Sequence, residues 1–401
     1  MNQTVSPISA TKETTNQKIG VVQPRLPAKK LIVVTLELLL SFPLALALTK
    51  LHFGGIAWIF GGIAAGTTIL QLCRIFYQYS PRPNRMARKV GMALVGLTVG
   101  ASNANTDLTS LGPGIPVFIL LTLFLLLCGG CIGYIYSRLS HTNLLTAMLA
   151  TVPGGVGVMS SIAADYNKNV TLVAMVQAIR VTSVVLLIPF IARTAVGNYF
   201  NLPSLPINSG WLNFDVSQLQ LLGIALPITA LIVYLAGIFK LPAGDFFGSL
   251  LLGLTLNCVL GWLPFVGDIN FNPPQLVNII GQMLLGITIG EYWGEKPAFG
   301  KRTIGYALMS VIMTLIAGAI ATILAMQLTS WDWLTCLLVT APGGAAEMIL
   351  VSLTLDHNVE IVTTGHLVRL IAINSSLPLW LFLFRRLETQ GTGEWGLGTG
   401  D

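Results

Sequence analysis

Twelve apolar runs, separated by short polar connections, dominate this sequence of 401 residues. Most of them reach the ~20 residues that an α-helix needs to cross the hydrocarbon core of a bilayer. Only 9% of the residues are charged, whereas about a quarter are charged in an ordinary soluble domain. The sequence therefore predicts an all-α polytopic membrane protein and excludes a soluble or a disordered chain. The runs comprise residues 31–49, 52–72, 90–106, 116–136, 142–164, 170–192, 218–239, 242–265, 274–290, 303–327, 333–354 and 360–384.

Four of these runs are irregular, and they lie at matching places in two halves of the chain. Runs 90–106 and 274–290 are short and rich in glycine, and two others carry Pro-Gly-Gly in their middle, at residues 153–155 and 342–344. Shifted by 189 residues, 153–189 aligns with 342–378 without a gap, and nine of the 37 pairs are identical. The sequence therefore predicts a duplication of about 190 residues.

The basic residues distinguish two topologies. If each Pro-Gly-Gly run crosses the membrane, each half has six spans, and 14 of the 20 Lys and Arg residues other than Arg180 and Arg369 face the cytoplasm. If each run dips in and returns, 18 of those 20 face the cytoplasm. Because basic residues gather on the cytoplasmic side, we predict two inverted repeats of five transmembrane helices, each with a Pro-Gly-Gly re-entrant hairpin. Twelve spans, six plus six, in which Pro-Gly-Gly only kinks a spanning helix, are the alternative.

This topology places both termini in the cytoplasm and divides the chain into five parts. The five parts are a disordered polar tail at 1–30, membrane repeat 1 at 31–196, an extracytoplasmic linker at 197–217, membrane repeat 2 at 218–386 and a loose tail at 387–401. The net charge of +6 comes from basic residues at the ends of apolar runs, so we expect the lipid bilayer and no nucleic acid as partner.

Small residues such as Gly62 and Gly66 predict close helix packing and leave a homodimer open.

Charged residues inside the apolar runs are functional candidates, because each costs roughly 2.5–3.5 kcal/mol at a helix centre on insertion scales. Arg180 and Arg369 are repeat mates. One hypothesis is that both guanidinium groups grip a carboxylate or another anion. The alternative, weighted equally, is that each arginine ties down hairpin carbonyls or a glutamate. Helix N-termini at the breaks would donate further N–H groups to the anion. The glycines would also let the anion approach the backbone closely, because they have no side chain. The residues of the two breaks are Pro153, Gly154, Gly155, Pro342, Gly343 and Gly344.

Glu347 is a candidate coupling residue. It follows the second Pro-Gly-Gly, whereas its repeat position holds Val158, so the two halves differ in charge there. This asymmetry suits a carboxylate that couples transport to protons or sodium ions. A salt bridge of Glu347 to Arg369 or Arg180 is the alternative.

Further polar residues accompany the arginines. Gln177 and His366 each lie three residues before an arginine and so share its helical face. His366 could carry a proton near neutral pH, or be a buried, hydrogen-bonded histidine. Asn169 and Asn358 begin the arginine helices and are interpreted as caps. Glu37 has no repeat partner and could serve packing or function.

The segments 151–159 (TVPGGVGVM) and 340–348 (TAPGGAAEM) resemble the signature of the AbrB family of bacterial membrane proteins. The resemblance covers about residues 30–385 and includes the arginine that follows each segment. It implies an integral protein of the bacterial inner membrane and is compatible with a transporter, although the family also carries the labels ammonia monooxygenase and regulator of gene expression. The glutamate of the signature stands only at Glu347.

Three function classes follow. We predict a secondary transporter for a small, anionic solute, with its site at the membrane midplane between the two hairpins. A membrane sensor or regulator affecting gene expression is the alternative. A membrane monooxygenase is disfavoured, because no two of the four histidines form a spaced pair that could begin a copper or iron site. We therefore expect no enzyme activity, no metal and no cofactor.

Overall fold

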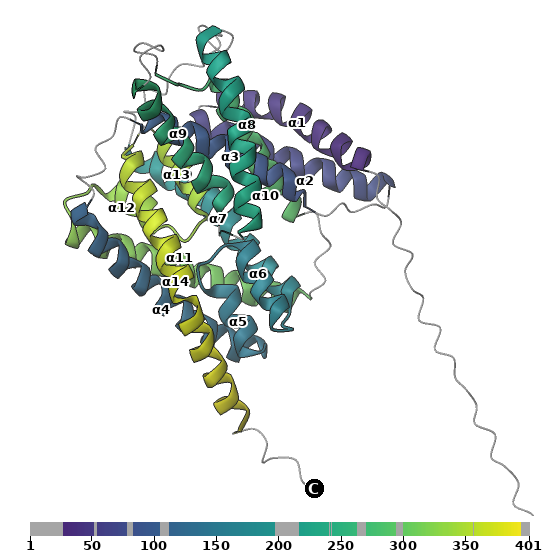
Figure 1. The fold of residues 1–401 in the computed structure, drawn as a ribbon. Helices are drawn as coiled ribbons and strands as arrows, with labels where there is room; N and C mark the ends of the chain where they lie inside the picture. Colours follow the sequence, from purple (N-terminus) through teal and green to yellow (C-terminus); the bar gives the residue numbers. More distant parts are fainter. Residues whose placement is uncertain are drawn as a thin grey trace, which may run out of the picture.

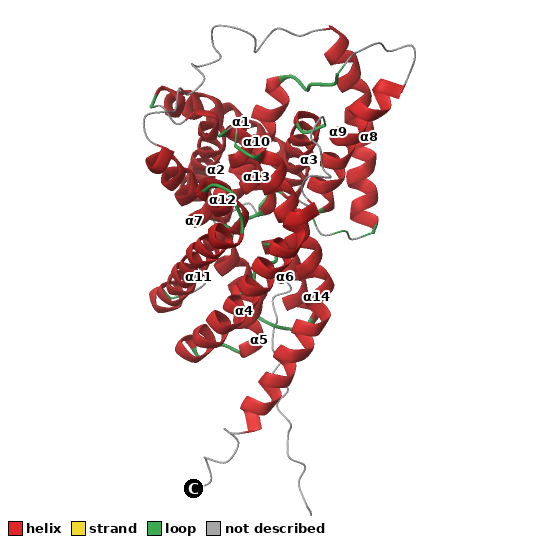
Figure 2. Cartoon of the chain, turned by 90° about the vertical axis from the view of Figure 1, so that its left-hand side faces the viewer, coloured by secondary structure: helices red, strands yellow, loops and turns green. Residues whose placement is uncertain are grey.

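All regular structure in the described part of the chain is helical (Figure 2). The computed structural model describes residues 27–51, 54–77, 83–104, 112–196, 216–239, 241, 243–262, 270–293, 300–355 and 357–393. These residues form fourteen α-helices and two 3-10 turns, at Gly54–Ile56 and at residues 112–114. An all-α fold is therefore confirmed.

Six helices form a first group, which we name bundle A (Figure 1). Its central contacts are α2 against α10, α3 against α9, and α3 against α10, with α1 and α8 packed outside. Each of the first two pairs joins a helix from the first half of the chain to one from the second half. Bundle A consists of α1 (Pro27–Lys50), α2 (Ala57–Tyr77), α3 (Arg85–Ser102), α8 (Val216–Ile238), α9 (Gly244–Trp262) and α10 (Gln275–Tyr292).

The other eight helices form bundle B, which contains both Pro-Gly-Gly sequences. Four long helices surround two pairs of short ones, α5 with α6 and α12 with α13. Bundle B meets bundle A chiefly where α13 packs against α3 and where α7 packs against α10. Its helices are α4 (Ile115–Ser140), α5 (Leu144–Thr151), α6 (Val156–Asp165), α7 (Val170–Val196), α11 (Lys301–Leu328), α12 (Trp333–Thr340), α13 (Ala345–Thr354) and α14 (Val359–Gly393).

Glycine lets the helices of bundle A approach each other backbone to backbone. A methyl group at Gly62 would lie 2.5 Å from the carbonyl oxygen of Met283, and one at Gly66 would lie as close to that of Ile287. On the facing helix, a methyl group at Gly286 would collide with the main chain of Ile59. The packing through Gly62 and Gly66 that the sequence predicts is thus a contact between α2 and α10.

Seven of the described helices are long and apolar enough to cross a bilayer: α1, α2, α4, α7, α8, α11 and α14. These helices indicate a chain that crosses the membrane several times. The ten predicted spans would also require α9 and the 18-residue helices α3 and α10. The short helices of bundle B have only 8 to 10 residues each, about half the length that a span needs.

The ends of the membrane region differ from the predicted boundaries. Helix α1 begins at Pro27, inside the predicted tail, because proline is favoured in the first turn of a helix. Helix α14 continues to Gly393, into the predicted loose tail, because residues 387–390 (LETQ) allow the helix to extend past the apolar run. Residues 1–26, 394–401 and nearly all of the predicted linker 197–217 lie outside the described residues.

Candidate functional site

Each Pro-Gly-Gly sequence separates two short helices of bundle B. The first break lies between α5 and α6, and the second lies between α12 and α13. Gly155 is the N-cap of α6 and has a φ of 78°, a left-handed conformation that favours glycine. Gly344 is the N-cap of α13. Because glycine has no side chain to accept hydrogen bonds from the first turn, both helix N-termini can offer N–H groups to an anion.

Arg180 on α7 is bound to the first break. Its Nη1 donates to the carbonyl oxygens of Thr151 at 3.1 Å and Val152 at 3.4 Å. Its Nη2 donates to Gln177 Oε1 at 2.6 Å, and Gln177 Nε2 donates to the carbonyls of Leu149 and Val152. These bonds satisfy carbonyl groups that have no partner within the helix at the C-terminus of α5.

Arg369 on α14 is bound to the second break in the same way. Its Nη1 donates to the carbonyl of Ala341 at 2.8 Å and its Nη2 to that of Gly343 at 3.3 Å. Its Nη2 also lies 2.6 Å from His366 Nδ1, and His366 Nε2 lies 3.0 Å from the carbonyl of Leu338. Because arginine can only donate and a carbonyl can only accept, His366 is neutral here, with its proton on Nε2. Its role as a proton carrier stays a prediction.

The two networks use positions that are 189 residues apart. The donors Gln177 and Arg180 correspond to His366 and Arg369, and their acceptors Leu149 and Val152 correspond to Leu338 and Ala341. The same spacing recurs where a long helix packs on each break: the Thr151 hydroxyl donates to the Gly129 carbonyl, and the Thr340 hydroxyl to that of Gly318. The second-half network is therefore the counterpart of the first.

Both arginines are buried cations whose hydrogen bonds go to uncharged groups. Arg180 is 3% exposed and Arg369 is 7% exposed, and the two charges lie close enough to repel each other. Among the described residues, neither guanidinium group is paired with a carboxylate, and Arg180 Nε has no hydrogen-bond acceptor. The geometry bears out the tie to hairpin carbonyls, and this tie leaves both positive charges available to an anion.

The glycines of the breaks are packed unequally. A methyl group at Gly154 would collide with Met159 in its own half. A methyl group at Gly343 would lie 2.8 Å from Val184 Cγ1. Because Val184 is on α7, the helix that carries Arg180 also contacts the second break, and α7 therefore brings the two breaks together.

Glu347 does not pair with either arginine of the breaks. It is 1% exposed in the first turn of α13, and Arg88 Nη2 of α3 lies 3.8 Å from its Oε1. Neither carboxylate oxygen has a hydrogen-bond partner in the described part of the chain. The alternative of a salt bridge to Arg369 or Arg180 is thus wrong, because α13 faces α3 of bundle A. Sequence reasoning missed Arg88, because it lies just before the apolar run 90–106.

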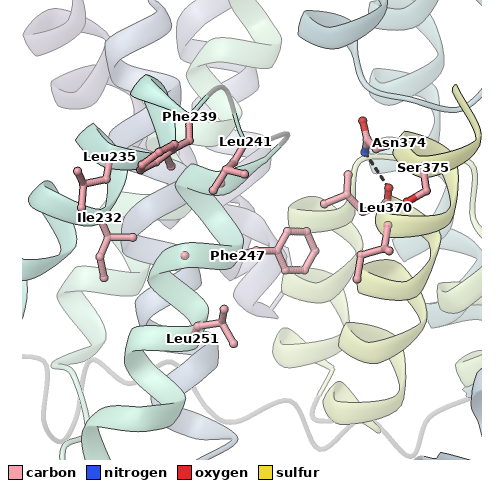
Figure 3. Close-up of a pocket in the computed structure, with 13 residues that line it drawn as sticks. Ile232, Leu235, Phe239, Leu241, Phe247, Leu251, Leu370, Asn374 and Ser375 are labelled. Carbon is pink, nitrogen blue, oxygen red and sulfur yellow. Dashed lines mark hydrogen bonds between the residues drawn. The ribbon is translucent and has the colours of Figure 1, made fainter. Parts of the chain in front are cut away.

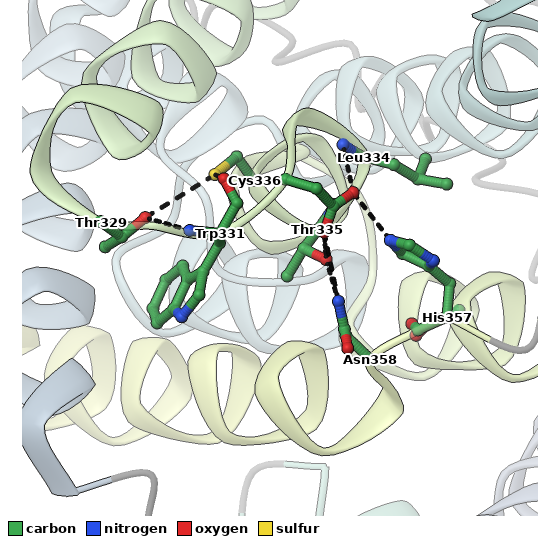
Figure 4. A network of polar contacts seen from close by, with 9 residues as sticks. Thr329, Trp331, Leu334, Thr335, Cys336, His357 and Asn358 are labelled. Atoms are coloured by element: carbon green, nitrogen blue, oxygen red, sulfur yellow. Dashed lines mark hydrogen bonds and ion pairs between the residues drawn. The ribbon is translucent and has the colours of Figure 1, made fainter. Parts of the chain in front are cut away.

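Asp332 organises the base of the second broken pair (Figure 4). Its carboxylate caps α12, accepting from the backbone N–H groups of Leu334 and Thr335. It also lies 2.7 Å from His357 Nε2 and accepts from Asn358 Nδ2 at 3.2 Å. Burial alone would raise the pKa of Asp332, but the hydrogen bonds from Thr335 and His357 outweigh it and hold that pKa below its ordinary value.

The two asparagines at the starts of the arginine helices differ. Asn169 caps α7, because its Oδ1 accepts from the N–H of Leu172 at 3.0 Å. The side chain of Asn358 instead donates to Asp332 and to the Thr335 hydroxyl. Asp332 itself corresponds, at the spacing of 189, to Asn143, the cap of α5. Extending the sequence alignment upstream would have revealed Asp332.

Two more buried carboxylates lie in bundle A. Glu37 on α1 is fully buried, and neither oxygen has a hydrogen-bond partner among the described residues. Glu291 on α10 is 1% exposed, and its Oε2 accepts from the Asn84 N–H at 2.7 Å. Sequence reasoning missed Glu291 because it directly follows an apolar run. Neither residue contacts the breaks, so both stay outside the candidate site.

An apolar crevice of about 480 Å³ opens between α8, α9 and α14 (Figure 3). Its lining is apolar except for Asn374 and Ser375. The Asn374 amide donates to the carbonyl of Leu370, one turn back on α14. The crevice contains none of the predicted site residues. In the described part of the chain, no three His, Cys, Asp or Glu side chains lie together as a metal site would require.

Comparison with known proteins finds one matching family and two curated relatives. A family model described as "Transition state regulatory protein AbrB" matches residues 58–385. The "Uncharacterized protein YhjN" of Bacillus subtilis (strain 168) is 26% identical over 355 residues, covering 86% of this chain and 91% of that protein. The "Putative regulator AbrB" of Escherichia coli (strain K12) is 24% identical over 297 residues, covering 72% of this chain and 80% of that protein.

Proposed function

Because the chain belongs to the AbrB family of bacterial multi-pass membrane proteins, we propose that it is a secondary transporter for a small, anionic solute. The proposed site lies near the membrane midplane, between the first break and the second. Arg180 and Arg369 attract the solute, a helix N-terminus at the breaks donates N–H groups to it, and Glu347 couples its movement to that of an ion.

One observation carries this proposal: two buried guanidinium groups, each bound to one of the two breaks that α7 contacts, have no carboxylate partner among the described residues. A charge at membrane depth is costly unless it is paired. An anion that bound between Arg180 and Arg369 would relieve the repulsion between them. Guanidinium groups suit carboxylate or phosphate oxygens in particular, because they donate through a planar fork.

Helix directions support two re-entrant pairs. Gln177 bonds to the carbonyls of Leu149 and Val152, and Arg180, one turn later on α7, bonds to those of Thr151 and Val152. This order is what α5 and α7 running in the same direction would give. A four-residue connection joins α6 to α7, and the two helices pack together, so α6 runs in the opposite direction. Both ends of the α5–α6 pair then lie on one side of the membrane.

The two pairs open toward opposite ends of α4, which supports the inverted arrangement. The base of the first pair follows Ser140, the last residue of α4. Next to the base of the second pair, the Trp331 ring stacks on Phe118 in the first turn of α4, with centroids 5.0 Å apart. A helix of 26 residues is about 39 Å long, enough to separate the two bases by the whole membrane.

The test measures anion binding by purified protein in detergent and transport in proteoliposomes. Acetate, succinate, phosphate and sulfate serve as probes, because a ligand that binds only the folded protein raises its melting temperature. At least one anion is expected to stabilise the wild type and to enter proteoliposomes. Arg180→Ala and Arg369→Ala are each expected to abolish both effects, since each removes one of the two cations.

Matched variants separate charge from folding. Arg180→Lys keeps the charge and tests whether a folded variant retains partial binding. Arg138→Ala removes an exposed arginine on α4 and should bind like the wild type. Wild-type binding by a folded Arg180→Ala/Arg369→Ala double variant would contradict the site, and failure of every anion to bind the wild type would contradict the function.

A sensor or regulator is the second candidate, favoured by the printed name of the Escherichia coli relative. Such a protein would act through a bound partner or through the solute it senses. Recovery of a stoichiometric protein partner from native membranes, combined with anion binding but no flux in proteoliposomes, would favour this alternative.

A further inference from the structure

The N-termini of α6 and α13 differ in one respect that bears on the solute. The third residue of α13 is Glu347, whose carboxylate folds back so far that a methyl group at Gly344 would collide with it. The third residue of α6 is Val158. A methyl group at Gly155 or at Gly157 would meet no atom within 4 Å. The positive end of α13 is therefore covered by a carboxylate of the chain itself, and that of α6 is not.

The exposed face of α6, at whose deep end the uncovered N-terminus lies, carries no large apolar side chain and is therefore suited to contact with water. The exposed positions of α6 carry only small or polar side chains, at Gly157, Ser161, Ala164 and Asp165. By contrast, the exposed face of α7 carries the large apolar side chains that lipid contact favours, at Leu186, Leu187, Phe190 and Ile191. The face of α6 can thus line a polar path that runs from Asp165 to Gly155, the deep end of the helix.

Arg180 provides a second, independent indication of a ligand. This side chain is 3% exposed and holds the carbonyls of Thr151 and Val152, immediately before the break that leads to α6. Its Nε has no acceptor in the part of the chain that the structure describes. Glu347, the carboxylate of the other half, is paired with Arg88 instead. A donor without an acceptor and a charge without a carboxylate partner are therefore held against the two residues that precede the break before α6.

We propose that each chain binds one oxyanion at the N-terminus of α6, beside Arg180, while Glu347 takes the equivalent place on α13. This inference rests on the proposed transport function and specifies its site. One oxygen of the anion accepts from the first-turn N–H groups of α6, and another accepts from Arg180. Carboxylates and inorganic oxyanions share this chemistry, and the probe anions distinguish them.

Filling the site with a carboxylate of the chain tests the proposal. Val158→Glu copies Glu347 onto α6 and should weaken binding of the best probe anion by at least about tenfold, a loss of ~1.4 kcal/mol. Val158→Gln has nearly the same size without the charge and should bind within about threefold of the wild type, because it adds no charge at α6. A saturation experiment with the radiolabelled anion should give one site per chain.

A second measurement does not depend on Val158→Glu folding correctly. Gly157→Cys places a thiol on the open face of α6, and the bound anion should slow its reaction with a charged maleimide. Ile191→Cys, on the apolar face of α7, is the control whose labelling the anion should not change.

The outcomes separate this inference from the proposed function. Wild-type affinity in a folded Val158→Glu variant, or labelling of Gly157→Cys that the anion does not slow, would overturn the α6 site. The transporter would survive either result if Arg180→Ala still abolished binding. Two anions per chain would also overturn the inference, whereas binding of none by the wild type would overturn the proposed function itself.

Discussion

Two single carboxylates, Asp332 and Glu347, fix the second broken pair to its neighbours. Asp332 caps α12 and binds His357 and Asn358, so it closes the base of the pair. Glu347 lies at the other end, over the first turn of α13, and reaches bundle A through Arg88. The second broken pair is thus held by two acidic groups, Asp332 at the start of α12 and Glu347 in the first turn of α13.

The lowered pKa of Asp332 predicts a loss of stability in acid. Because its folded pKa lies below the ordinary value, its contribution is fully present above about pH 4 and is lost as the pH falls through the folded pKa. Asp332→Asn should lower the melting temperature at pH 7, because the amide can still cap α12 but loses the negative charge that strengthens the hydrogen bonds from the Thr335 hydroxyl and from His357 Nε2. The difference from the wild type should shrink as the pH falls below about 4, the ordinary pKa of an aspartate, towards the lower pKa of the folded protein. Asp165→Asn, an exposed change at the end of α6, is the control, and a difference independent of pH would contradict this account.

At the scale of elements, the packing of bundle A depends chiefly on close contacts between helices that contain glycine. Gly62 and Gly66 on α2 meet Gly286 and Gly290 on α10, and their backbones approach without side chains between them. Dispersion between closely packed backbones stabilises helix pairs in lipid, where no hydrophobic force acts between apolar helices. Bundle A therefore depends on four positions that have no side-chain chemistry.

The same substitution should have opposite effects on two helices. Gly286→Ala places a methyl group against the main chain of Ile59 and should destabilise the protein by roughly 1–3 kcal/mol through overpacking. Gly223→Ala on α8 meets open space and should be neutral or stabilising by up to ~1 kcal/mol, because alanine favours helix. Thermal unfolding in detergent measures both effects. Equal changes in melting temperature would contradict the packing argument.

The arrangement of the two broken pairs is the main question at the scale of the whole molecule. Bundle B holds both pairs, and bundle A meets it chiefly through α3 against α13 and α10 against α7. The second pair is therefore covered by bundle A at Glu347, whereas none of the residues that the structure describes covers the exposed face of α6 in the first pair. Such an unequal cover is what alternating access requires of one of its two states.

Labelling from each side of the membrane tests the topology directly. Asp165→Cys lies at the base of the first pair, and Ser330→Cys lies at the base of the second; both positions are exposed. With two re-entrant pairs, an impermeant maleimide should label Ser330→Cys in intact cells and Asp165→Cys only in inverted vesicles. The twelve-span alternative predicts the reverse. The native cysteines in the parent protein supply the background.

Much of this architecture could be predicted from local patterns. The twelve apolar runs all contain helices, and both Pro-Gly-Gly sequences break them at the expected positions. Proline removes a backbone donor and glycine adopts conformations that other residues avoid, so a break is encoded by the residues that form it. Arg180 and Arg369 could be placed on the helices that follow, but the sequence left open whether they bind hairpin carbonyls or an anion.

The sequence by itself determined which segments are helices, where two of them break, and which charges lie deep in apolar surroundings, because these properties depend on neighbouring residues. Only the tertiary structure decided which groups meet. Glu347 faces Arg88 and not Arg369, because α13 of bundle B packs against α3 of bundle A. Glu347 and Arg88 lie on different helices, so whether they meet depends on how α13 and α3 are aligned. That alignment is set by side-chain shape and by how closely the helix backbones approach in both bundles.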